Sequence, residues 1–249
     1  MTTLDVKATS NSTADGKAGG VAEGGIAVAV LDVESTVSAI TRAYVGDGAR
    51  VHAGQLNLEA NATSVAKAPS EVIGIGLLAG AGIELDTLDT TTVDAYIGAP
   101  TGTNSASPAA VEITGGGVKV LAKHNSTAQS KSKVTSVGLL GGAGSKTTSN
   151  SSPTVRSYLG DEATVKATDG AVTFDADSTA KAETEGSELA VGVLATVTIT
   201  EVTATVAPKV AAFTESGGSI DARSGHIISK SVTNVHSKMN ATSGGIVAV

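Results

Sequence analysis

The residues best suited to chemistry are three aspartates, Asp86, Asp89 and Asp94, in the segment ELDTLDTTTVDAY. Glycosidases use two carboxyl groups about 5 to 10 Å apart, one as an acid and the other as a base or nucleophile. Side chains alternate between the two faces of a strand. The spacings therefore put Asp86 and Asp89 on opposite faces, and Asp89 and Asp94 likewise. No arginine or aromatic platform accompanies them, so we predict a solvated acidic edge, with a carbohydrate-active enzyme as the alternative.

A second set of carboxylates lies in glycine-rich turns. Asp47 in GDG and Asp161 in GDE occupy equivalent positions, and carboxylates in such turns bind Ca²⁺ in some β-rolls. Those rolls need several aspartates at fixed spacing in every coil. Here the corresponding positions hold Ala99 and Glu215. We predict that the aspartates form turns, with calcium binding as the alternative.

The remaining reactive side chains form no recognisable constellation. The chain has no cysteine, which excludes disulfides, iron–sulfur clusters and thiol catalysis. Its serines lie in no nucleophile elbow. Its histidines have no second ligand at metal spacing, and we expect all four at the surface: His52, His124, His226 and His236. We predict no catalytic, cofactor-binding or metal-binding residue, and no enzymatic activity.

Charge and composition bear on the partners. The formal net charge is −7, the 17 lysines and arginines never form a basic run, and aromatic residues make up 2% of the chain. Nucleic-acid binding needs basic patches or aromatic platforms, so we expect no nucleic-acid partner.

The chain is built from repeats. The segment AYVGDGARVHAG at 43–54 returns as AYIG, then as SYLGDEATVKAT, and more weakly as AAFTESGGSIDA. The aromatic residue of each copy is Tyr44, Tyr96, Tyr158 or Phe213, at spacings of 52, 62 and 55. Fixed-period recurrence is typical of stacked repeat proteins. We expect these four residues to form an aromatic ladder.

One repeat carries an insertion. The next apolar strand residue follows the aromatic by 7 positions in three copies, whereas Tyr96 and Val111 are 15 apart. The eight extra residues lie around APTGTNSASPAA at 99–110, whose prolines, glycine and asparagine cannot continue a central strand.

The repeats form a single array over residues 1–249. We place their starts near residues 4, 56, 118, 172 and 227. The final GGIVAV at 244–249 echoes GGIAVAV at 24–30, so we expect the last repeat to be truncated and the chain to be part of a longer protein.

Composition favours β-structure. Hydrophobic residues make up 41% of the chain, and small or β-branched residues alternate with polar ones. The longest apolar stretch, at 72–85, is shorter than the ~20 residues that span a bilayer, so we expect no transmembrane segment. We predict an all-β parallel β-helix of about 53-residue repeats with about two coils each, and an antiparallel β-sandwich is the alternative.

The pattern A-Y-[IVL]-G-D-x-A-x-V-x-A, followed by a V-x-V-x-A strand, resembles the repeats of large bacterial leukotoxin-type filamentous adhesins. It is more loosely similar to filamentous haemagglutinins and autotransporter passengers. The resemblance covers essentially the whole chain. It implies a β-solenoid that is secreted or displayed at the bacterial cell surface as a stalk or fibre and used in adhesion.

Three functions follow for testing. The first is a structural or adhesive segment that engages host or neighbouring cell-surface molecules and contacts flanking repeats of its own chain. The second is a carbohydrate-active β-helix enzyme. The third is a passive surface-layer or matrix scaffold, which differs from the first in whether the array binds cells.

Overall fold

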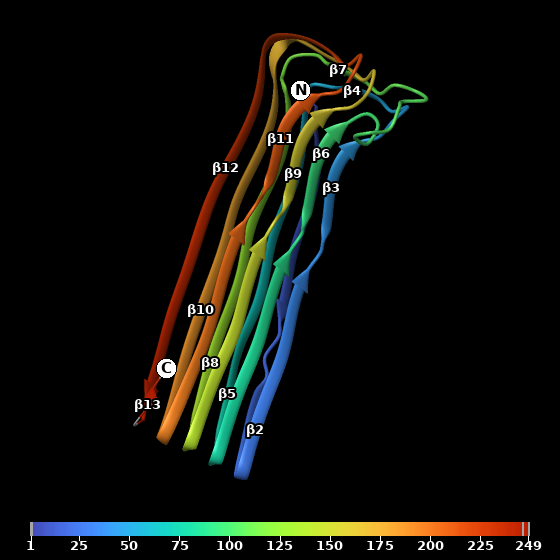
Figure 1. The fold of residues 1–249 in the computed structure, drawn as a ribbon. Coiled ribbons are helices and arrows are strands. Elements are labelled where there is room, and N and C mark those ends of the chain that lie inside the picture. Colours follow the sequence, from blue (N-terminus) through green and yellow to red (C-terminus); the bar gives the residue numbers. More distant parts are fainter. Residues whose placement is uncertain (1, 246, 249) are drawn as a thin grey trace.

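The computed structural model describes residues 2–245 and the backbone of residues 247 and 248, and all regular structure in this part is β-strand (Figure 1). The strands are β1 (Thr3–Asp15), β2 (Gly19–Val37), β3 (Ile40–Val45), β4 (Arg50–Ala53), β5 (Gln55–Asp89), β6 (Thr92–Ile97), β7 (Ala110–Ile113), β8 (Val118–Ser151), β9 (Thr154–Leu159), β10 (Thr164–Val206), β11 (Lys209–Thr214), β12 (Ser219–Gly244) and β13 (Val247–Ala248). Ile246 and Val249 of the echoed GGIVAV segment lie outside the described residues.

In each repeat the chain runs toward one end of the molecule, reverses its direction and returns. In β5 the chain folds back on itself, since a Cβ on Gly74 would lie 2.6 Å from the carbonyl oxygen of Gly80. Figure 1 shows the long strands reversing at one end and the loops beside β4 and β7 at the other. We call these the turn end and the loop end. Each repeat therefore contributes an outgoing and a returning segment to two facing layers.

All pairings between the described strands are parallel and join equivalent residues of neighbouring repeats. Leu4 pairs with Leu56, Leu56 with Val118, Val118 with Val172, and Val172 with Gly225. The fifth partner is Gly225, two positions before the predicted start near 227. The returning segments of β2, β5, β8 and β10 follow the same rule. The short strands β3, β6, β9 and β11 also follow it and form a sheet in that order.

This register corrects two expectations. Two coils per repeat would pair residues about half a repeat apart, but every pair is one full repeat apart, so that prediction is wrong. The antiparallel sandwich is also wrong, because the described strands pair in parallel. The prediction of an all-β fold with parallel strands is confirmed.

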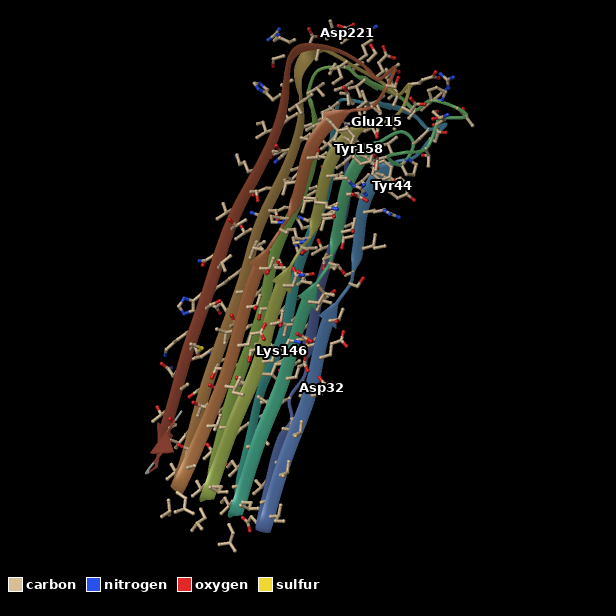
Figure 2. All side chains as sticks on the ribbon, in the orientation of Figure 1. Asp32, Tyr44, Lys146, Tyr158, Glu215 and Asp221 are labelled. Atoms are coloured by element: carbon tan, nitrogen blue, oxygen red, sulfur yellow. The ribbon has the colours of Figure 1, made fainter. Side chains whose placement is uncertain are left out.

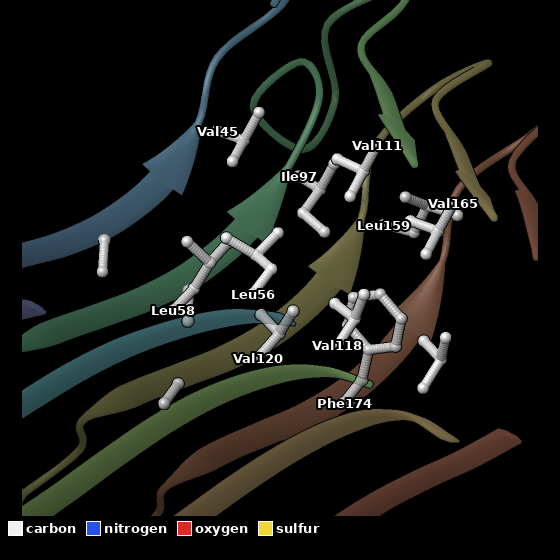
Figure 3. Close-up of a cluster of buried hydrophobic side chains, with 14 of the residues drawn as sticks. Val45, Leu56, Leu58, Ile97, Val111, Val118, Val120, Leu159, Val165 and Phe174 are labelled. Carbon is white, nitrogen blue, oxygen red and sulfur yellow. The ribbon is translucent and has the colours of Figure 1, made fainter. Parts of the chain in front are cut away.

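The core lies between the two layers and is divided along its length. Alternate residues of β5 face inward, starting with Leu56, Leu58 and Ala60. Branched side chains and Phe174 fill the loop end (Figure 3). A second apolar cluster that includes Val72 and Leu85 lies nearer the turn end. Between these clusters the inward positions are occupied mainly by serine and threonine.

Within the described residues, no helix of the length and hydrophobicity needed to span a membrane occurs.

Candidate functional site

The four aromatic rings form one stack at the loop end, where Figure 2 labels two of them. Successive ring centroids are 5.0, 4.9 and 5.1 Å apart, and the planes lie within 7° of parallel. Tyr44 at the edge is half exposed, whereas Tyr96 and Tyr158 are buried. Burial raises the pKa of both buried tyrosines, that of Tyr158 to about 12. The ladder therefore provides packing, and its inner hydroxyls stay protonated at physiological pH.

The insertion predicted around 99–110 is the loop 98–109, which ties three repeats together. The backbone N–H of Thr101 donates to the Tyr158 hydroxyl at 3.1 Å, and the Thr101 hydroxyl donates to Glu215 at 2.5 Å. The N–H of Ser105 donates to Asp161 at 3.0 Å. The loop thus contacts side chains from the third and fourth repeats.

Asp47 anchors the same loop from the first repeat. Its carboxylate accepts hydrogen bonds from the Ser105 hydroxyl at 2.6 Å and from the N–H groups of Ala106 and Ser107 at 3.2 and 3.4 Å. These bonds, led by that of Ser105, lower the pKa of Asp47. Asp47 and Asp161 both lie in turns, as the sequence predicted.

Asp94 is buried and lies between two arginines of the neighbouring repeats. It pairs with Arg42 in register on one side and Arg156 on the other. Its carboxylate accepts hydrogen bonds from Arg156 Nε at 2.8 Å and Nη2 at 3.0 Å, and from Arg42 Nε at 3.3 Å. The bond with Asp94 raises the pKa of Arg156. This row is a charge ladder next to the aromatic ladder.

Asp89 is also buried, but it lies on the inward side, opposite to the face that carries Asp94. Its carboxylate accepts bonds from the hydroxyls of Ser64, Ser126 and Thr91, and from the Thr91 N–H at 3.0 Å. These four donors satisfy the charge without a cation. The site is therefore a closed structural network.

His124 completes this network. Its Nε2 lies 2.9 Å from the Ser64 hydroxyl oxygen. Because that hydroxyl donates its hydrogen to Asp89, the His124 Nε2–H must be the donor in this contact. Its Nδ1 is buried without a hydrogen-bond partner. Burial lowers the pKa of His124, against the opposing charge of Asp89.

Two site predictions are corrected by this geometry. Asp89 and Asp94 are not a solvated acidic edge, because both are buried and fully bonded, although they do lie on opposite faces as their spacing indicated. His124 is not at the surface. The other three histidines are exposed, and His52 lies 3.4 Å from Glu112.

A third buried acid lies nearer the turn end. Glu188 accepts hydrogen bonds from the hydroxyls of Ser145 and Thr200. Burial raises its pKa, and the bond with Ser145 opposes this shift. Like Asp89, it is enclosed by hydroxyl groups of the facing layer.

The buried acids Asp89, Asp94 and Glu188 all accept hydrogen bonds from neighbouring side chains, and these bonds hold the carboxylates in place. Across the described residues, no three His, Asp or Glu side chains converge in a way that could hold a metal ion.

The outer side of the outgoing layer is polar and grooved, and we call it the polar face. A groove of about 710 Å³ there is lined by Lys17, Pro69, Glu71, Lys131, Lys133 and Glu185. Lys133 pairs with Glu71 at 2.7 Å, and Lys131 with Glu185 at 3.3 Å. A second groove of about 560 Å³ lies closer to the loop end, beside Lys7, Glu59 and Lys119. Rows of alternating charge therefore follow the stacking direction.

Comparisons with protein families, with curated proteins and with solved structures found no match to this chain.

The two arginines that pair with Asp94 were not predicted from the sequence. The signal was present, because Arg42, Asp94 and Arg156 each stand two positions before a ladder tyrosine. The network around Asp89 carried a weaker signal, since Ser64, His124 and Ser126 become neighbours only through the register and the reversal of the chain.

Proposed function

We propose that this chain is a segment of a parallel β-solenoid, with one coil per repeat, that serves as a structural and adhesive stalk. Its place would be in a large secreted or surface-displayed bacterial protein, in line with the sequence resemblance. One observation carries this proposal: equivalent residues of successive repeats pair in parallel along nearly the whole repeat. Each repeat thereby presents a backbone edge that the next repeat can use.

Adhesion is assigned to the polar face. Its charged side chains are exposed and repeat along the stack, so a cell-surface ligand with polar or charged groups could contact several repeats at once. The buried acids Asp89 and Asp94 already have their hydrogen bonds inside the protein, which supports a non-enzymatic role.

The test is adhesion of beads coated with the purified chain to host or bacterial cells. We expect the wild-type chain to bind and the double variant Lys131→Ala, Lys133→Ala to lose most of the binding. Lys146→Ala is the matched control, because Lys146 is an exposed, paired lysine on the returning layer. Binding that is equal in all three would contradict assignment to the polar face.

Failure of every form to bind cells would instead favour the passive scaffold. Turnover of an acidic polysaccharide, abolished by Asp89→Asn, would contradict the non-enzymatic proposal and favour the carbohydrate-active alternative.

A further inference from the structure

Charged rows run along the stack on both outer sides of the molecule. The row on the returning layer consists of Asp32, Glu84, Lys146 and Glu201. Figure 2 labels Asp32 and Lys146 from this row. On the polar face, two adjacent rows form a charged band, whose members from the second to the fifth repeat are Glu71, Lys131, Lys133, Glu185 and Lys238. In the row and in the band, the charge changes sign from each repeat to the next over these residues.

The row and the band lie at the same height along the strands. Across the core, the hydroxyl of Ser149 donates to that of Ser130 at 3.1 Å, and the hydroxyl of Thr147 donates to that of Ser132 at 3.0 Å. These contacts place Lys146 level with Lys133, one position along from Ser132. A second copy of the chain in the same orientation, laid with its returning layer on the polar face, therefore brings the row against the band.

The charges select one displacement of the second copy along the stack. When the copy is displaced by one repeat, about 4.8 Å, Glu84 faces Lys131 and Lys133. At the same displacement Lys146 faces Glu185, and Glu201 faces Lys238. Without displacement, Lys146 would face two lysines and Glu201 would face Glu185. Like charges brought together at an interface cost several kcal/mol, so the level arrangement is excluded.

The next charged row of the returning layer agrees with this displacement. Glu34 and Asp86 are in register with each other and lie two positions beyond Asp32 and Glu84. In the displaced copy Glu34 faces Lys67, and Asp86 faces Lys131. A displacement in the opposite direction would instead bring Asp86 beside Asp15.

One acid in the band meets another acid. Asp32 lies near Glu71, but Glu71 is already paired with Lys133 at 2.7 Å. The contact therefore leaves no uncompensated charge between the two copies.

Apolar surfaces also meet at this displacement. Nearer the turn end, Val28 of the returning layer faces Ile73 of the polar face, and Gly142 faces Leu189. Val28 is 67% exposed and Leu189 is 40% exposed. A Cβ at Gly142 would meet nothing within 4 Å, so there is room for the leucine of the second copy. Apolar side chains and opposite charges are thus matched in a single arrangement, as at specific protein interfaces.

We propose that the returning layer of one chain binds the polar face of a second, equally oriented copy that is displaced by one repeat. The contact joins two different surfaces, so it does not close on itself and further copies can add in the same way. Every such assembly ends in one uncovered polar face, which stays open to the cell-surface ligand proposed above.

Charge reversal at one facing pair tests the contact. Glu84→Lys places a positive charge against Lys131 and Lys133, and Lys131→Glu places an acid against Glu84 and Asp86. Each variant alone should associate at least tenfold more weakly than the wild type. An equimolar mixture should recover the association, because the two reversed side chains then face each other. Lys166→Glu is the control, since Lys166 is an exposed, paired lysine at the loop end, outside both rows.

Sedimentation velocity of the 249-residue chain over a wide concentration range is the measurement, and circular dichroism reports the folding of each variant. We expect wild-type assemblies larger than a dimer that grow with concentration. They should shrink in about 1 M sodium chloride, where the screening length falls to about 3 Å. This salt dependence needs no variant, so it tests the charge pairing even if a variant does not fold.

Several results would overturn the proposal. The wild-type chain could stay monomeric, form only a dimer, or associate equally well in high salt. The mixture of the two reversed variants could fail to recover the association, or Lys166→Glu could weaken it as much as they do. A monomer that co-sediments with polygalacturonate would also overturn it, in favour of an acidic polysaccharide as the partner of this face.

Discussion

At the scale of single residues, the buried charges of this protein are held by partners from other repeats. Asp94 illustrates the point, because Arg42 and Arg156 reach it from the repeats on either side. The ion pairs therefore link neighbouring repeats, and their loss weakens the stack rather than one repeat.

Asp94→Asn should lower the free energy of unfolding by about 1 to 3 kcal/mol, since it leaves two guanidinium groups without their charged partner. Urea denaturation measures the effect. Asp86→Asn is the matched control, because Asp86 lies in the same acidic segment and points outward. An equal effect in the two variants would contradict the structural role of the Asp94 ladder.

His124 should make stability depend on pH. Burial lowers its pKa in the folded state, so the unfolded chain binds a proton more readily than the folded chain. The contribution is present above about pH 6.5, the ordinary histidine value, and is lost as the pH falls below it. The melting temperature of the wild type should therefore fall more steeply between pH 7.5 and pH 5 than that of His124→Asn. His226→Asn, at an exposed position, should keep the wild-type slope, and parallel slopes for all three proteins would refute the assignment.

At the scale of elements, the reversal of each long strand depends on glycines that are stacked in register. Gly76, Gly138 and Gly192 occupy equivalent positions. A Cβ on Gly138 would lie 2.5 Å from the carbonyl oxygen of Gly76 and 2.9 Å from that of Leu140. The turn end therefore excludes larger residues because of close backbone approach, and a substitution there disturbs two repeats.

We expect Gly138→Ala to destabilise the protein by about 2 kcal/mol, the usual cost of overpacking. Gly142→Ala, four positions away in open space, should change stability by less than about 0.5 kcal/mol. Thermal unfolding of the two variants compares them directly. Destabilisation of the same size at both positions would show that loss of glycine flexibility, and not backbone contact, is responsible.

At the scale of the whole molecule, the parallel stacking and the aromatic ladder could be predicted because each repeat copies the last. The number of coils could not. The period of a repeat does not determine how far a strand extends before the chain reverses. Nothing in the sequence distinguishes Gly76, which lies at the reversal, from the other glycines. The buried network could not be predicted either, because Ser64, His124 and Asp89 are polar residues that are expected at the surface. Their contacts form only when the returning segment is placed opposite the outgoing one.

The most direct test of the register is disulfide formation between Thr63→Cys and Asn125→Cys in the cysteine-free chain. Thr63 and Asn125 are exposed and paired in register, where neighbouring strands are about 4.8 Å apart, within reach of a disulfide. In the control pair Thr63→Cys and Lys123→Cys, the two positions are offset along the strands by two residues and lie about 8 Å apart, beyond that reach. One coil per repeat predicts efficient cross-linking of the first pair and little of the second. Failure of the first pair, or equal linking of both, would contradict it.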